Sequence, residues 1–233
     1  MIGFYNYTMF LTYLSLISAT GGIIIATQDS GHPYVGMFFL LISGLCDAFD
    51  GRVARTKKNR SDLEKRFGVQ VDSLADLVAF GVLPCCIGNA MLRSNPKYMD
   101  RPFFLEKDGG LQWYSIVLGA ITLLYVVAAL VRLAYFNATE EERNEAAAKS
   151  GRAEFTGLPV TSAALVFPFI LMLHYIFSMD FTVVYFSVML LMAILFVSKF
   201  KLKKPTAKGV WIMVGIGLVE FVVLIIYFNL RKH

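Results

Sequence analysis

Long apolar stretches separated by short polar loops dominate the chain. The hydrocarbon core of a bilayer is about 30 Å thick, so a helix needs roughly 20 mostly apolar residues to cross it. The pattern predicts seven membrane-spanning helices, at Tyr7–Ala26, Tyr34–Ala54, Val69–Leu92, Tyr114–Asn137, Pro159–Phe177, Phe181–Phe200 and Val210–Leu230. We therefore predict an all-α fold, a polytopic bundle of membrane helices that forms one integral membrane domain over residues 1–233.

Basic residues are concentrated in some of the loops between these spans. Three loops are polar and basic, namely residues 55–68, 138–157 and 199–208. Cytoplasmic loops carry an excess of lysine and arginine, so these three loops are predicted to face the cytoplasm. The short segments 27–33 and 178–180 lack both residues, and the mixed-charge segment 93–112 is then external. An odd number of spans gives a cytoplasmic N-terminus and an external C-terminus. The basic tail 231–233 argues against that C-terminus, which leaves open whether the last span crosses.

The composition agrees with a membrane protein. The chain is 57% hydrophobic and 17% charged, whereas soluble domains carry about a quarter charged residues. The formal net charge of +5 lies in basic loops beside apolar spans, so we predict no nucleic-acid partner. Cys46, Cys85 and Cys86 lie in apolar segments without metal-ligand spacing, which is typical of small buried hydrophobic residues.

Four aspartates lie within the apolar sequence LCDAFDGRVAR and GVQVDSLAD. Ionised carboxylates in a membrane segment are costly and usually mark a functional site. On helices, Asp47 and Asp50 share one face, as do Asp72 and Asp76. Two such helices packed antiparallel would direct four carboxylates into one small volume. That much repulsion is tolerable only around cations.

Oxygen ligands of this kind suit a hard divalent cation. Mg²⁺ typically takes a few carboxylates together with substrate phosphates, and no Cys or His ligand set that would suit zinc lies nearby. The four acids suffice for two Mg²⁺ or Mn²⁺ ions that clamp a phosphoryl group. The alternative is structural: Asp50 capping a helix end, and Asp72 pairing with Arg55 or Arg66 without chemistry.

The residues between the acids fit the same interpretation. Gly51 and Ala54 remove side-chain bulk one turn apart, so that a ligand or a neighbouring helix can approach closely. Arg55 follows, where its planar guanidinium can bind phosphate oxygens, and Gly68 supplies another small position. Asp76, one turn deeper than Asp72, is the candidate to accept a proton from the nucleophile.

The run Asp47-x-x-Asp50-Gly51-x-x-Ala54-Arg55…Gly68-x-x-x-Asp72-x-x-x-Asp76 resembles the signature of the CDP-alcohol phosphotransferases. The resemblance implies a core of about six membrane helices, here roughly residues 5–200, with an added span near 210–230, and a homodimer. Twelve residues separate Arg55 from Gly68, whereas the family pattern has about eight, and a longer loop is thermodynamically cheap.

The resemblance also implies roles for individual residues. The metal ligands would be Asp47, Asp50, Asp72 and Asp76, with Asp76 also acting as the catalytic base. The nucleotide and its diphosphate would be bound at Asp47, Gly51, Ala54, Arg55 and Gly68.

Further segments narrow the resemblance to the phosphatidylserine synthases of this family. VDSLADLVAFGVLP at 71–84, VRLAYFN at 131–137 and FTGLPV at 155–160 carry it, although a second arginine would be expected in place of Tyr135. The implied reaction is attack of the L-serine hydroxyl on the lipid-bearing phosphorus of CDP-diacylglycerol, with release of CMP.

Three residues are candidates to hold the acceptor: Arg132, Asn137 and Arg152. Arg132 lies near the cytoplasmic end of an apolar span, so it is placed to meet the serine carboxylate or a lipid phosphate, or to snorkel to the interface instead. Lys65 and Arg66 are expected to meet anionic membrane lipids.

Two alternatives stay open. The same chemistry suits another acceptor, such as glycerol 3-phosphate or an inositol phosphate. A transporter or channel for divalent cations would also carry intramembrane acids, but at several depths or near the midplane. Here the acids cluster towards one predicted membrane face, with Glu220 in the last span as an isolated exception.

Overall fold

Helices make up most of the chain in the computed structural model, which describes residues 3–28, 32–95, 113–140, 154–177, 179–203 and 207–231. The longer helices are α1 (Phe10–Thr27), α2 (Pro33–Ala54), α3 (Asp62–Asp76), α4 (Leu83–Ser94), α5 (Trp113–Ala138), α7 (Ala163–Phe177), α8 (Thr182–Val197) and α9 (Ala207–Arg231). Shorter turns of helix are η1 (Tyr7–Met9), η2 (Leu77–Val82) and η3 (Val160–Ser162). Strands β1 (Glu154–Thr156) and β2 (Lys201–Lys203) pair antiparallel.

The predicted all-α membrane bundle is confirmed. Within the described residues, five helical segments are long and apolar enough to cross a membrane, namely Tyr7–Thr27, Pro33–Ala54, Asp62–Ser94, Ile116–Ala138 and Val160–Phe177. The apolar helices at Thr182–Val197 and Trp211–Ile226 are shorter. Helix α8 rises about 24 Å over its 16 residues, which is less than the hydrocarbon core of about 30 Å. The residues that flank α8 would therefore have to complete a membrane crossing.

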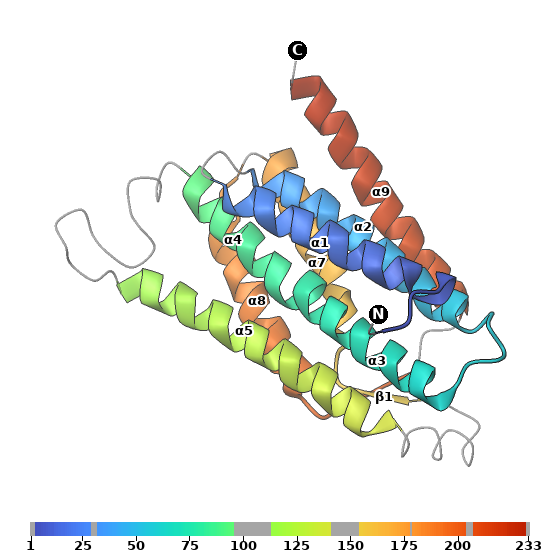
Figure 1. The fold of residues 1–233 in the computed structure, drawn as a ribbon. Helices are drawn as coiled ribbons and strands as arrows, with labels where there is room; N and C mark the ends of the chain where they lie inside the picture. The colour runs from blue at the N-terminus through green and yellow to red at the C-terminus, as the bar shows by residue number, and fades with distance from the viewer. Residues whose placement is uncertain are drawn as a thin grey trace.

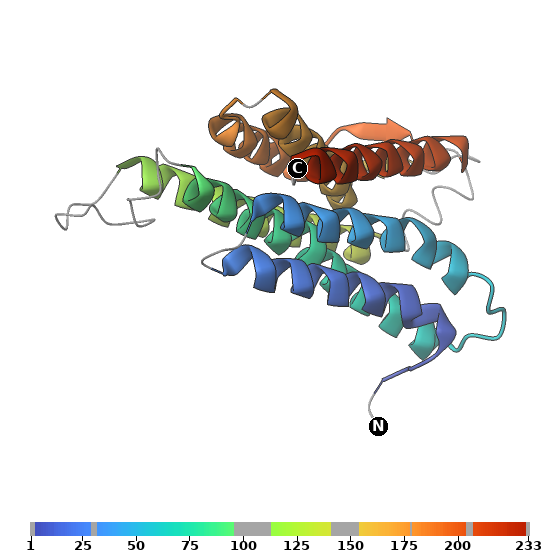
Figure 2. The same cartoon turned by 90° about the horizontal axis from the view of Figure 1, so that it is seen from above.

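The helices run side by side in a bundle with distinct ends (Figure 1). Helix α1 packs against α2 and α4, α5 packs against α8, and α9 lies against α7 and α2. Figure 2 shows α9 beside α2 on the outside of the bundle. The α2–α3 loop (residues 55–61), β1 and β2 lie at one end, called the basic end below. The pairing of β1 with β2 joins two of the predicted basic loops there.

Aromatic side chains fill the centre of the bundle. Phe80, Tyr125, Phe167 and Tyr185 are fully buried, and the Tyr125 and Phe167 rings meet edge-on with centroids 5.7 Å apart. Large apolar side chains also cover the outside: Leu123, for example, is 70% exposed. A soluble monomer rarely exposes so much contiguous apolar surface, so this exterior is suited to lipid.

Helix α3 begins earlier than predicted. The expected span started at Val69, but the helix starts at Asp62, and half of the predicted 55–68 loop is helical. The reason is the N-cap residue Ser61, whose side chain accepts a hydrogen bond from the Glu64 backbone N–H at 3.1 Å.

Helix α3 continues through η2 into α4, and η2 is a π-helix that starts directly after Asp76. Such single wide turns occur frequently at functional sites. Pro84 has no backbone N–H to donate to the Phe80 carbonyl four residues earlier. The Tyr125 hydroxyl on α5 donates to that carbonyl at 2.7 Å. Helix α5 thereby braces the wide turn beside Asp76.

The Tyr125→Phe variant is expected to be less stable by about 1–3 kcal/mol, because it removes the donor to a buried carbonyl. Thermal unfolding of the detergent-solubilised protein should show a midpoint lowered by several degrees. Tyr135→Phe is the matched control, since Tyr135 lies on the same helix with an exposed side chain. Equal midpoints for the two variants would contradict this role of the Tyr125 hydroxyl.

Candidate active site

Two antiparallel helices place the four aspartates near the basic end. Asp47 and Asp50 lie in the last two turns of α2, and Asp72 and Asp76 lie in the last two turns of α3. Asp50 and Asp76 are buried, whereas Asp47 and Asp72 are half-buried. The i, i+3 and i, i+4 spacings put both members of each pair on one helix face.

The carboxylates converge in space. One oxygen from each of Asp47, Asp50 and Asp72 lies within 4.8 Å of the others. Asp76 is within hydrogen-bonding reach of Asp47, and Asp72 is within reach of Asp50. The structure therefore brings together all four acids that were predicted from the sequence.

This concentration of negative charge has little compensation from the protein. Among the described residues, the ion pairs involve Glu64 and Asp62 and none of the four aspartates. Thr12 on α1 donates a hydrogen bond to Asp50 Oδ2 at 3.1 Å. Arg55 acts on Asp50 electrostatically without forming an ion pair. Several hard oxygen donors around one small volume suit a divalent cation, so the residues present fit a metal.

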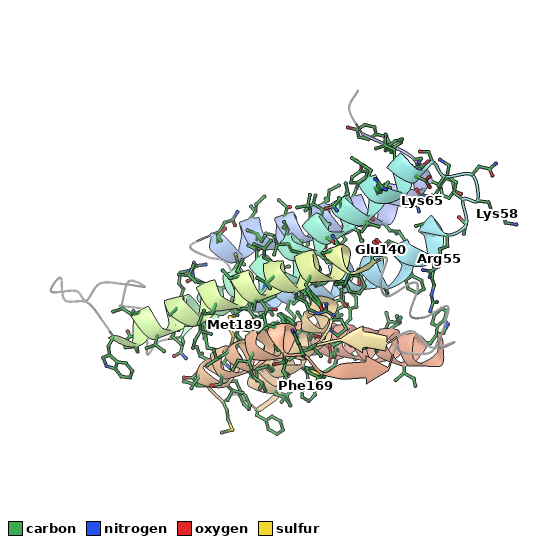
Figure 3. All side chains as sticks on the ribbon, turned by 90° about the horizontal axis from the view of Figure 1, so that it is seen from below. Arg55, Lys58, Lys65, Glu140, Phe169 and Met189 are labelled. Carbon is green, nitrogen blue, oxygen red and sulfur yellow. The ribbon has the colours of Figure 1, made fainter. Side chains whose placement is uncertain are left out.

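The residues predicted for the nucleotide lie at the end of α2. Gly51 is exposed, and within the described part of the chain a Cβ built on it would meet only the Arg55 guanidinium, at 3.7 Å. Ala54 is half-buried, and Arg55 is exposed as the C-cap of α2. Figure 3 shows Arg55 at the same end of the molecule as Lys58 and Lys65. The space above Gly51 is therefore open to an anionic ligand approaching from the basic end.

A buried glutamate holds the α2–α3 loop in place. Glu64 is 5% exposed, and its Oε1 accepts from Asn6 Nδ2 at 2.6 Å and from Lys57 Nζ at 2.9 Å. Arg60 donates to the Ala54 carbonyl at 3.3 Å. These contacts of Glu64 and Arg60 are called the Glu64 clamp below. A Cβ on Gly68 would lie 2.8 Å from the Arg60 guanidinium, so the absence of a side chain at Gly68 leaves room for Arg60. Its role in nucleotide binding stays a prediction.

The predicted acceptor residues differ in their surroundings. Arg132 is buried, its Nε donates to the Leu158 carbonyl at 3.1 Å, and its guanidinium lies over the Phe136 ring. It therefore does not snorkel. The Asn137 amide donates to Ser73 Oγ at 2.9 Å, and Ser73 lies between Asp72 and Asp76 in α3. Arg152 lies outside the described residues.

Sequence reasoning missed polar residues that support the site. Thr12 lies on α1 in a buried stripe with Ser15 and Ser18, and Ser15 exchanges hydrogen bonds with Ser43 of α2. The recurrence of small hydroxyl residues every three or four positions in the first span was the available signal. This stripe fastens α1 to α2 beneath Asp50.

Comparisons with known proteins agree with the geometry. The family model described as CDP-alcohol phosphatidyltransferase matches residues 5–196. CDP-diacylglycerol–serine O-phosphatidyltransferase of Saccharomyces cerevisiae is 37% identical over 130 residues, which are 55% of this chain and 38% of that protein. The enzyme of the same name from Mycobacterium bovis is 29% identical over 156 residues, which are 66% of this chain and 45% of that protein.

Archaetidylserine synthase of Methanothermobacter thermautotrophicus is 28% identical over 153 residues, 65% of this chain and 53% of that protein. The chain thus spans about half the length of these curated relatives, or less. The family match, by contrast, covers most of the chain and includes all four aspartates. The chain belongs to the CDP-alcohol phosphatidyltransferase family.

Proposed function

We propose that the protein transfers the phosphatidyl group of CDP-diacylglycerol to the hydroxyl of L-serine, forming phosphatidylserine and CMP. The observation that carries this proposal is the convergence of Asp47, Asp50 and Asp72, with ligand oxygens within 4.8 Å of one another. The names of the curated relatives support serine as the acceptor, and family membership supports a CDP-linked donor.

The four aspartates would hold two divalent cations, Mg²⁺ or Mn²⁺. Bound ions of this kind neutralise charge on a diphosphate and on a departing phosphate. Asp47, Asp50 and Asp72 supply the converging oxygens, and Asp76 extends the set through its contact with Asp47. Thr12, by donating to Asp50, fixes the orientation of one carboxylate.

The nucleotide end of the donor would lie over the end of α2. Gly51 and Ala54 leave room for the cytidine diphosphate to approach the helix, and Asp47 and Gly68 belong to the same proposed site. Arg55, exposed beside Gly51, has a planar guanidinium that suits bidentate binding of phosphate oxygens.

Asp76 is proposed as the base. The serine hydroxyl oxygen forms a bond to the lipid-bearing phosphorus, the bond from that phosphorus to the CMP oxygen breaks, and the hydroxyl proton passes to Asp76. Burial of Asp76 beside Asp47 keeps bulk water away from the carboxylate. A carboxylate within reach of the attacking hydroxyl is the geometry that general-base catalysis needs.

Arg132, Asn137 and Arg152 are the proposed acceptor residues. Asn137 has the closest structural link to the site, because it hydrogen-bonds Ser73 between two of the aspartates. Arg132 is buried and holds the Leu158 backbone through its Nε, so its proposed part is to bring a positive charge to this side of the site.

The setting of the site is also part of the proposal. The basic end would face the cytoplasm, by the excess of lysine and arginine there, where both a lipid headgroup and soluble serine can reach it. The whole chain would form one membrane domain with a catalytic core at about residues 5–200. Assembly as a homodimer rests on the family resemblance.

Acceptor competition tests the proposed function. Purified protein in detergent would receive CDP-diacylglycerol, Mn²⁺ and equal concentrations of serine, glycerol 3-phosphate and an inositol phosphate. We expect CMP release with phosphatidylserine as the dominant lipid product. Efficient transfer to another alcohol with none to serine would contradict the proposed acceptor.

The same preparation separates the enzyme from a cation transporter. A transporter reconstituted in vesicles would show metal flux without CMP release. Glu220, the remaining acid in an apolar span, is buried on α9 and is not a member of the converging carboxylate group.

A further inference from the structure

A cavity of about 560 Å³ opens beside the aspartate cluster. Helix α2 contributes Asp47 and Leu41 to its lining, α7 contributes Leu165, and α9 contributes Gly217 and Phe221. Its volume lies within the roughly 300–1,000 Å³ typical of ligand sites. The stretch of α2 from Asp47 to Leu41 runs about 9 Å away from the basic end. The cavity is therefore a largely apolar groove with one carboxylate at the end nearest the cluster.

Helix α9 forms one wall of this groove, although it lies beyond the residues matched by the family model. It is held in place at two levels. Phe221 meets the Phe38 ring of α2 edge-on with centroids 5.2 Å apart. Nearer the basic end, the Arg52 guanidinium lies over the Trp211 ring at 5.4 Å. Figures 1 and 2 show α9 alongside α2 on the outer side of the bundle.

We propose that this groove, closed on one side by α9, holds an acyl chain of the CDP-linked lipid donor. The inference rests on the proposed function and assigns α9 a substrate-binding role. A ligand bound here must be apolar along most of its length and must carry its polar part at Asp47. A nucleotide-linked diacyl lipid has that arrangement, with its diphosphate at the aspartates and its chains directed away from them.

Two glycines of α9 distinguish the groove from the lipid-facing side of the same helix. A Cβ on Gly217 would lie 3.4 Å from Leu165 Cδ2 and 3.9 Å from Leu41 Cδ2, in ordinary contact, so a larger side chain there would enter the groove. Among the described residues, a Cβ on Gly215 would meet no atom within 4 Å. Leucine at position 217 should therefore fill the groove, whereas leucine at position 215 should not.

The test compares Gly217→Leu with Gly215→Leu, using dioleoyl and dihexanoyl CDP-diacylglycerol as donors for CMP release with serine. Because one or two methylenes change discrimination in an apolar site by about tenfold or more, Gly217→Leu should raise the KM for the dioleoyl donor at least tenfold. The KM for the dihexanoyl donor should change little. Gly215→Leu should match the wild type with both donors, and Gly217→Ala should be intermediate.

Photolabelling of the wild-type protein decides the question even if Gly217→Leu fails to fold. CDP-diacylglycerol with a diazirine in one acyl chain should label peptides of α9 and α7. Unlabelled CDP-diacylglycerol should compete with this labelling, and phosphatidylcholine should not. Labelling that both lipids displace equally would assign the groove to bulk membrane lipid and overturn the proposal.

Identical donor profiles for correctly folded Gly217→Leu and Gly215→Leu would also overturn it. Failure of the proposed function is distinguishable, because wild-type protein would then release no CMP with serine. If unlabelled CDP-diacylglycerol still displaced the photolabel from α9 in that case, the groove would remain supported as the donor-lipid site.

Discussion

The Asp76→Asn variant is expected to lose about 10²- to 10⁴-fold in turnover, the range that general-base catalysis contributes. Asparagine keeps the size of the side chain but cannot take the proton of the serine hydroxyl. CMP release at saturating serine measures the loss. Binding of the CDP-linked lipid should be largely retained, because Asp47, Asp50 and Asp72 still converge without Asp76.

Asp62→Asn is the matched control for this substitution. Asp62 lies on the same helix, its side chain is 89% exposed, and its ion pair with Lys65 is on the surface. Its activity should equal that of the wild type. Comparable turnover in Asp76→Asn and Asp62→Asn would eliminate Asp76 as the base.

Loss of divalent metal is expected to abolish activity, and weakening a ligand should raise the metal requirement. Chelation with EDTA should abolish CMP release, and added Mn²⁺ or Mg²⁺ should restore it. For Asp47→Asn and Asp72→Asn, we expect the Mn²⁺ concentration at half-maximal rate to rise at least about 10- to 100-fold, the loss seen even for residues that only support metal ligands. Each substitution removes a charged oxygen from the converging group.

CMP release measured over a range of Mn²⁺ concentrations gives the concentration at half-maximal rate. Isothermal titration calorimetry measures Mn²⁺ binding in the absence of turnover. The Asp62→Asn protein again provides the control. Activity that survives exhaustive chelation, or wild-type metal dependence in both ligand variants, would contradict the metal role of the cluster.

The positions of the membrane helices were largely predictable because they depend on local properties. The length of an apolar run decides whether it can cross a bilayer, and the predicted spans lie within a few residues of the helices observed. The start of α3 was missed because the span was judged by hydropathy alone. The Ser61 N-cap acts on the backbone N–H of Glu64 and leaves no trace in hydropathy.

The surroundings of the polar side chains were much less predictable. Arg132 near the end of an apolar span suggested either an acceptor ligand or a snorkelling residue. The structure buries it against the Leu158 backbone, a contact between segments 26 residues apart. Neither the hydrogen bond from Tyr125 to the Phe80 carbonyl nor the Glu64 clamp follows from spacing along one helix.

Local spacing was enough to put each pair of aspartates on one helix face and to point to a divalent cation, because helical periodicity depends on near neighbours alone. Which faces meet was decided by packing between distant segments. That packing sets Asp47 against Asp76, brings Asn137 to Ser73, and lays α9 over the groove beside Asp47. Such contacts depend on the shapes of side chains on several helices at once, and no repeat along a single helix records them.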